Sequence, residues 1–133
     1  MNIPDIVKSA KTIAVVGLSN KPERYSYQVA DYLQKHGYRI IPVNPNVSDV
    51  LGEISYPDLL SIPQDIPIDI VDIFRRSELV LPHVAEAVKR GDIKLIWMQE
   101  GVENEEARKL AEDNGMAVVM NACLMVQHKH YET

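Results

Sequence analysis

The alternation of short apolar runs with helix-patterned segments is the feature that most constrains how this chain can fold. The apolar runs are rich in β-branched residues, as at residues 12–17, and this is typical of strands buried on both faces. Helices between such strands act as crossover connections, which make the strands parallel. The predicted strands span residues 12–17, 38–43, 68–74, 93–98 and 116–120.

The segments between these strands complete an α/β pattern. Apolar residues at helical spacing predict helices over residues 27–36, 77–90, 103–114 and 123–130, with Ser26 as the N-cap of the first. The proline-rich residues 46–67 predict a loop with a brief helix. We therefore predict a Rossmann-like, three-layer α/β/α fold. Its five-stranded parallel sheet is expected in the order 3-2-1-4-5, with the strands numbered along the chain.

Length and charge limit the classes of function. The 133 residues suit one domain, expected to span residues 1–133, and the formal net charge of -5 weighs against nucleic acid or an anionic membrane surface as a partner. The sequence begins without the pattern of a signal peptide and has no apolar run of the roughly 20 residues that a membrane span needs. We expect a soluble, cytoplasmic protein.

The loop after the first predicted strand has the position of a phosphate site. It leads into a helix N-terminus, where free N–H groups and the helix dipole favour an anion. Two cations and two hydroxyl groups in the loop could add charge and hydrogen bonds. The candidate ligand-binding residues of this loop are Gly17, Ser19, Asn20, Lys21, Arg24 and Ser26.

The dinucleotide-binding fingerprint is only partly present. Ser19 and Pro22 stand where G-x-G-x-x-G requires glycines. The acidic residue that receives the ribose after the second strand is replaced by the Pro-Val-Asn-Pro sequence at residues 42–45. These departures weaken an NAD(P) site without removing it, because Asn44 still offers a donor and an acceptor.

Two further groups of residues follow predicted strands at the same sheet edge. Phe74 and Arg75 come after the third strand, where an aromatic ring could stack on adenine and a guanidinium could hold a phosphate. Gln99 and Gly101 follow the fourth strand. Because the carboxyl ends of parallel strands share one edge, we expect these residues beside the Gly17 loop.

Five segments in order resemble the small bacterial and archaeal CoA-binding proteins, whose domain is similar to the CoA-binding domain of the succinyl-CoA synthetase alpha subunit. The resemblance covers essentially the whole chain. The segments are VVGLS at 15–19, GYRIIPVNP at 37–45, VDIFRR at 71–76, WMQEGV at 97–102 and CLMVQH at 123–128. Gln127 departs from relatives that carry a carboxylate there.

The resemblance implies coenzyme A as the cofactor and a role for each group of residues. The loop at residues 17–26 would hold the pyrophosphate, and Asn44 and Pro45 would line the nucleotide crevice. Phe74 with Arg75 would border the adenosine, and residues 99–101 would lie toward the pantetheine arm. The family implies no well-defined catalytic activity.

The remaining reactive residue types fit structural roles better. Cys123 is the sole cysteine and sits among apolar residues, so we expect it to be packed, with a reactive thiol as the alternative. His128 and His130 are two positions apart and would diverge on a helix, which argues against a metal site. Asp69 and Asp72 are expected to be hydrogen-bonded structural carboxylates.

Three hypotheses about function follow. The leading one is a protein that binds coenzyme A or acyl-CoA without chemistry of its own, as a carrier, a sensor or a partner of an acyl-CoA enzyme. The second is an NAD(P)-binding redox protein. The third is a small acyl-transfer enzyme that depends on Cys123 or His128. The sequence favours the first, because it supplies a cofactor crevice but no evident set of nucleophile, base and orienting group.

Overall fold

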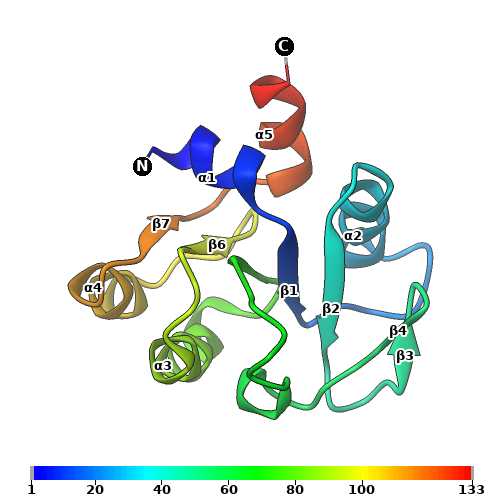
Figure 1. The fold of residues 1–133 in the computed structure, drawn as a ribbon, viewed down its shortest axis with the longest axis horizontal. Helices are drawn as coiled ribbons and strands as arrows, with labels where there is room; N and C mark the ends of the chain where they lie inside the picture. The colour runs from blue at the N-terminus through cyan, green and yellow to red at the C-terminus, as the bar shows by residue number, and fades with distance from the viewer. Residues whose placement is uncertain (1, 133) are drawn as a thin grey trace.

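A five-stranded parallel sheet lies at the centre of the protein (Figure 1). The structure, a computed structural model, describes residues 2–132, so Met1 and Thr133, the ends of the predicted domain, lie outside the described residues. The strands are β1 (Thr12–Val16), β2 (Arg39–Val43), β5 (Ile70–Ile73), β6 (Leu95–Met98) and β7 (Ala117–Val119). The predicted α/β class and parallel sheet are confirmed.

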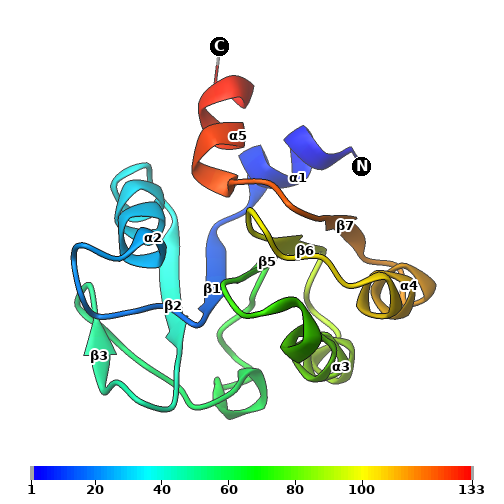
Figure 2. The same cartoon turned by 180° about the vertical axis from the view of Figure 1, so that it is seen from behind.

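Helices cover both faces of the sheet and form two apolar cores. They are α1 (Ile3–Ser9), α2 (Tyr25–Lys35), α3 (Val80–Arg90), α4 (Glu105–Asp113) and α5 (Leu124–Tyr131). α1, α2 and α5 pack on one face, and α3 and α4 pack on the other (Figures 1 and 2). α1 was not predicted, although Asn2 marks its start by accepting a hydrogen bond from the Asp5 N–H. None of the helices in residues 2–132 is long and apolar enough to span a membrane.

The predicted strand order was wrong. The sheet runs β2-β1-β5-β6-β7, which is 2-1-3-4-5 in predicted strand numbers, so the second strand is an edge strand. Pro42 gives the reason, because proline has no N–H and is confined to edge strands or bulges. Its carbonyl oxygen faces away from β1 and accepts a hydrogen bond from the Tyr56 N–H. β5 is buried along its whole length and lies in the middle of the sheet.

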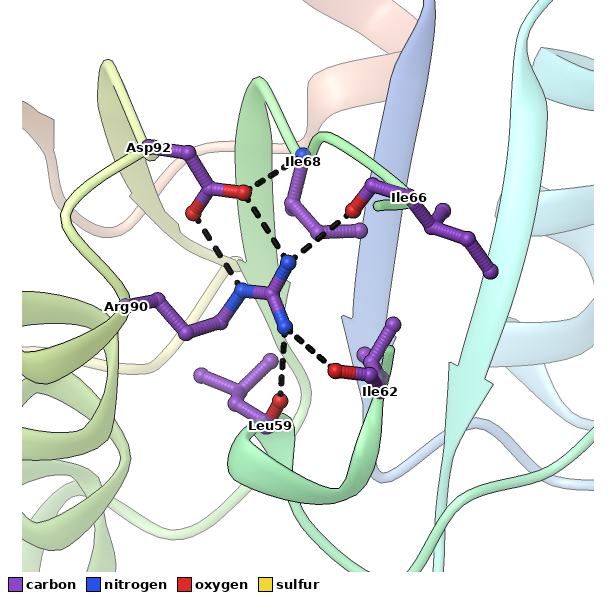
Figure 3. Close-up of polar contacts among 6 residues, drawn as sticks. All are labelled: Leu59, Ile62, Ile66, Ile68, Arg90 and Asp92. Carbon is purple, nitrogen blue, oxygen red and sulfur yellow. Dashed lines mark hydrogen bonds and ion pairs between the residues drawn. The ribbon is translucent and has the colours of Figure 1, made fainter. Parts of the chain in front are cut away.

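The connection from β2 to β5 has no α-helix, and buried side-chain hydrogen bonds hold it instead. It contains the hairpin of β3 (Asp49–Val50) and β4 (Glu53–Ile54) and the 3₁₀ turn η1 (Leu59–Ser61). The fully buried guanidinium of Arg90 donates to the carbonyl oxygens of Leu59, Ile62 and Ile66 and pairs with Asp92 (Figure 3). Backbone groups that would otherwise be buried without partners are thereby satisfied.

Candidate functional site

A cavity of about 600 Å³ opens at the carboxyl ends of β1 and β5. Strand order reverses beside β1, since β2 lies on one side of it and β5 on the other. Such a switch point is where α/β sheets bind ligands, and the volume is in the range of small-molecule sites. The cavity is lined by Gly17, Ser19, Lys21, Arg24, Tyr25, Ser26, Asn46 and Phe74.

Gly17 allows the backbones that follow β1 and β5 to meet. Its φ is +83°, and a Cβ atom at this position would lie 2.3 Å from the Phe74 carbonyl oxygen. The Phe74 N–H in turn donates to the Val16 carbonyl oxygen at 2.8 Å. Any side chain at residue 17 would be strained in this left-handed conformation and would also collide with the backbone of Phe74.

Two serines shape the loop that leads into α2. The Ser26 hydroxyl accepts a hydrogen bond from the Ser19 N–H at 3.0 Å, and the Ser19 hydroxyl accepts one from the Lys21 N–H at 3.1 Å. Ser26 is therefore inside α2 rather than at its predicted N-cap position, which Arg24 occupies without a side-chain hydrogen bond. Each hydroxyl keeps its proton for another acceptor, and the first N–H groups of α2 have no side-chain cap.

Lys21 and Arg24 make the cavity wall positive. Both side chains are exposed, and neither forms an ion pair within the described part of the chain. Although the chain has a formal net charge of -5, these two cations create a local region of positive charge beside a helix N-terminus. The arrangement can hold a dianionic group such as a pyrophosphate.

The two predicted residues that follow β2 are near the cavity but do not line it. The side chain of Asn44 has a structural role. Its amide nitrogen donates to the Leu18 carbonyl oxygen, and its amide oxygen accepts from the Asn46 N–H. Pro45 is exposed beside it. The residue that lines the cavity is Asn46, which was not predicted although it directly follows the Asn-Pro pair.

Four other predicted residues also lie outside the cavity lining. The Arg75 side chain is half-buried against Gly17, and Asn20 is exposed on the loop. Gln99 is buried, and its side-chain oxygen accepts the Leu124 N–H at the start of α5. The exposed Gly101 donates its N–H to a neighbouring side chain, that of Asn121. The carboxyl end of β6 is therefore joined to α5.

Tyr25, within the predicted loop but not singled out there, connects the cavity with Cys123. Its ring lies edge-to-face with Phe74, with 6.3 Å between ring centroids. Its hydroxyl donates a hydrogen bond to the Cys123 Sγ. Burial raises the pKa of the Tyr25 hydroxyl, and the hydrogen bond with Cys123 raises it further, so the phenol stays protonated. Cys123 as a residue is 5% exposed, in agreement with its predicted packing.

The two strand aspartates have different environments. Asp69 accepts hydrogen bonds from the N–H groups of Lys11 and Thr12 and pairs with Lys94, as expected of a structural carboxylate. Although partial burial opposes it, these contacts lower the pKa of Asp69. Asp72 is fully buried, and neither of its oxygens has a hydrogen-bond partner among the described residues. The expectation of a hydrogen-bonded Asp72 was wrong, and burial raises its pKa well above the usual value.

The acyl-transfer hypothesis needs a base beside Cys123, and the geometry of His128 does not provide one. Its Nδ1 lies 2.8 Å from the Tyr32 hydroxyl and its Nε2 lies 3.1 Å from a Glu132 carboxylate oxygen. Both ring nitrogens are thus engaged elsewhere. No group of three or more His, Cys, Asp or Glu side chains that could hold a metal ion is found between residues 2 and 132.

The parallel sheet, the switch point and the loop before α2 define a Rossmann-like α/β protein. A sequence model described as the CoA binding domain matches residues 11–129, so the chain belongs to the CoA-binding domain family. The resemblance in the sequence is thereby confirmed.

Two similar proteins match nearly the whole chain. Uncharacterized protein YneT of Bacillus subtilis is 45% identical over 126 residues, which are 95% of this chain and 91% of that protein. A solved structure of a hypothetical protein from Pyrococcus horikoshii is 40% identical with a TM-score of 0.91, and the match covers 97% of this chain and 89% of that one.

A longer enzyme shares the domain as well. The ADP-forming acetate–CoA ligase II of Archaeoglobus fulgidus is 29% identical over 114 residues. The match covers 83% of this chain but 16% of the ligase. The chain is thus related to one region of an acetate–CoA ligase.

Proposed function

We propose that this protein binds coenzyme A or an acyl-CoA, with the pyrophosphate held by the loop between β1 and α2. The observation that carries the proposal is that two unpaired cations, Lys21 and Arg24, and the uncapped start of α2 border one cavity. A pyrophosphate needs converging N–H and O–H donors together with positive charge. The Ser19 and Ser26 hydroxyl protons can supply two more hydrogen bonds.

Two further predicted residues, Phe74 and Arg75, have roles in this proposal. Phe74 lines the cavity and offers a ring face or edge to the adenosine half. Arg75 lies against Gly17 at the same sheet edge, where its guanidinium can reach the 3′-phosphate. Asn46 adds an amide on the β2 side of the cavity.

We infer a binding role without chemistry of its own, as a carrier, a sensor or a CoA-holding partner of an acyl-CoA enzyme. The similarity to a region of an acetate–CoA ligase supports this, because the shared part is a small fraction of that enzyme. The engagement of both His128 nitrogens, away from Cys123, supports it as well.

Replacing both loop cations tests the proposal. The double variant Lys21→Ala/Arg24→Ala should weaken CoA binding by at least about 100-fold, because hydrogen bonds to charged groups contribute roughly 1.5–3 kcal/mol each and each 1.4 kcal/mol is a factor of about ten. Isothermal titration calorimetry with CoA, 3′-dephospho-CoA and NAD measures the loss and ranks the ligands. The loss should shrink at high salt, since screening weakens the wild-type contacts.

The matched control is Lys89→Ala/Lys109→Ala, which removes the same charge from exposed positions on α3 and α4. It should leave CoA binding within about twofold of wild type, because those helices cover the sheet away from α2. Equal losses in both double variants would mean that net charge alone is responsible. Tighter binding of NAD than of CoA would overturn the proposed ligand.

A further inference from the structure

Two buried polar groups near the cavity have no hydrogen-bond partner among the described residues. They are the carboxyl oxygens of Asp72, a residue that is 0% exposed, and the amide nitrogen of Gln99, a residue that is 1% exposed. Leaving such groups unpaired costs folding free energy, so their presence calls for an explanation. One explanation is that a ligand supplies the missing partners.

The sheet register places both side chains on one face. Asp72 is paired with Trp97 across β5 and β6, and Gln99 lies two residues beyond Trp97. Because side chains alternate along a strand, Asp72, Trp97 and Gln99 all project toward α2 and α5. Trp97 confirms the direction, since its indole N–H donates to the carbonyl oxygen of Ala122, just before α5.

These groups lie close to the wall of the cavity. Phe74, which lines the cavity, is two residues beyond Asp72 on the same face of β5. The Gln99 side chain bonds the Leu124 N–H, next to Cys123, and Cys123 in turn holds the hydroxyl of the cavity residue Tyr25. Tyr25 therefore links the cavity wall to the start of α5, which Gln99 also contacts.

The hydrogen-bonding groups of Asp72 and Gln99 indicate which ligand group they could bind. Asp72 offers a hydrogen-bond acceptor and the Gln99 nitrogen offers a donor. Asp72 and Gln99 are diagonal neighbours on adjacent strands, and such neighbours lie about 7–8 Å apart. One secondary amide can bridge an acceptor and a donor at this separation, because its N–H and its C=O point in opposite directions. Of the two halves of CoA, the pantetheine arm carries secondary amides, whereas the nucleotide half carries the phosphates that suit Lys21 and Arg24.

We propose that Asp72 and Gln99 bind a secondary amide of the CoA pantetheine arm, with Asp72 accepting from its N–H and Gln99 donating to its C=O. The assignment rests on the proposed CoA function and extends it to the part of the ligand that bears the thiol. Neither residue lines the cavity, so the arm reaches them past Tyr25, which does line it.

The test compares CoA with 3′-phospho-ADP, the nucleotide half without the arm, by calorimetry. Asp72→Leu, close in shape but without acceptors, should weaken CoA about tenfold and leave 3′-phospho-ADP within about twofold. Gln99→Glu keeps the oxygen that receives the Leu124 N–H but loses the donor, and should have the same selective effect. Asp72→Asn, which retains one acceptor oxygen, should restore much of the CoA affinity.

Stability measurements separate this effect from misfolding. Asp72→Leu should unfold at the same or a higher temperature than wild type, because it removes an unpaired buried carboxyl group. The control Asp69→Asn should unfold at a lower temperature, yet its ratio of CoA to 3′-phospho-ADP affinity should be that of wild type. A lower melting temperature together with weaker CoA binding in every variant would overturn the assignment.

The possible outcomes also separate this inference from the proposed function. If wild type binds neither ligand, the CoA proposal fails and the amide assignment falls with it. If wild type binds both ligands and Asp72→Leu changes neither affinity, or changes both equally, only the amide assignment is overturned. In that case ordered water satisfies Asp72 and Gln99.

Discussion

At the scale of single residues, the candidate site depends on how closely the ends of β1 and β5 approach each other. Gly17 carries no Cβ, so the Phe74 carbonyl oxygen and the Arg75 side chain can pack against it. The glycine was evident in the sequence as the end of an apolar run. The contact of Gly17 with Phe74 was not evident in the sequence, because the pairing of β1 with β5 depends on the strand order.

Arg75 gives a prediction at this scale. Arg75→Ala should weaken CoA more than 3′-dephospho-CoA, because the guanidinium is placed to meet the 3′-phosphate, and we expect a loss of about tenfold for CoA. Arg76→Ala is the matched control, since Arg76 is exposed and pairs with Glu78. Calorimetric affinities for both ligands measure the difference. Equal weakening of the two ligands by Arg75→Ala would refute the 3′-phosphate contact.

At the scale of elements, the sequence patterns predicted the existence of helices and strands better than they predicted where each one begins and ends. The strand predicted over residues 68–74 is β5 at Ile70–Ile73, and the helix predicted over 103–114 is α4 at Glu105–Asp113. Asn104 caps α4 through the Ala107 N–H, a signal that was present in the sequence. The serine expected to cap α2, Ser26, instead binds Ser19, because the loop folds back on itself.

The crossover segment before β5 should depend on Arg90 for its stability. Arg90→Met keeps the approximate length of the side chain but loses its hydrogen bonds to three carbonyl oxygens and its ion pair with Asp92 (Figure 3). The carbonyl oxygens of Ile62 and Ile66 then lose the side-chain donor that satisfies them. We expect the free energy of unfolding to fall by about 3–5 kcal/mol. Urea denaturation measures it, with the exposed neighbour Lys89→Met as control. A loss below about 1 kcal/mol would show that the segment is held by its apolar contacts.

At the scale of the whole molecule, the first and last helices meet on one face of the sheet. α1 and α5 pack together beside α2 (Figure 2). The Tyr38 hydroxyl at the start of β2 donates to the Val7 carbonyl oxygen in α1, and its ring lies 5.6 Å from that of His128 in α5. His128 is 3% exposed and joins this cluster to Tyr32 of α2.

This cluster predicts a loss of stability in mild acid. Burial lowers the pKa of His128, His36 lowers it further, and Glu132 partly opposes both. The unfolded chain takes up a proton near pH 6.5, whereas folded His128 resists it until a lower pH, so this contribution to stability is lost as the pH falls below about 6.5. His128→Gln should be less stable than wild type at pH 7.5, and the gap should narrow at pH 5.5.

Urea denaturation at the two pH values measures the gap, and comparing variant with wild type cancels the carboxyl groups that titrate in both. Val126→Ala, at an exposed position on the same helix and without a titrating group, is the control and should follow the wild-type pH profile. A gap that stays constant between pH 7.5 and 5.5 would contradict a role for His128 protonation.

From local information alone, the alternation of buried strands and amphipathic helices determined the α/β class, the parallel sheet and the loop before α2. These follow from hydrophobic periodicity and from glycine and serine at particular positions, which act over a few residues. Tertiary structure decided the order of the strands, and with it which residues border β1. It also decided that Asp72 is buried without a partner while Asp69 is satisfied. Such outcomes depend on groups far apart in the chain, whose pairing no local pattern specifies.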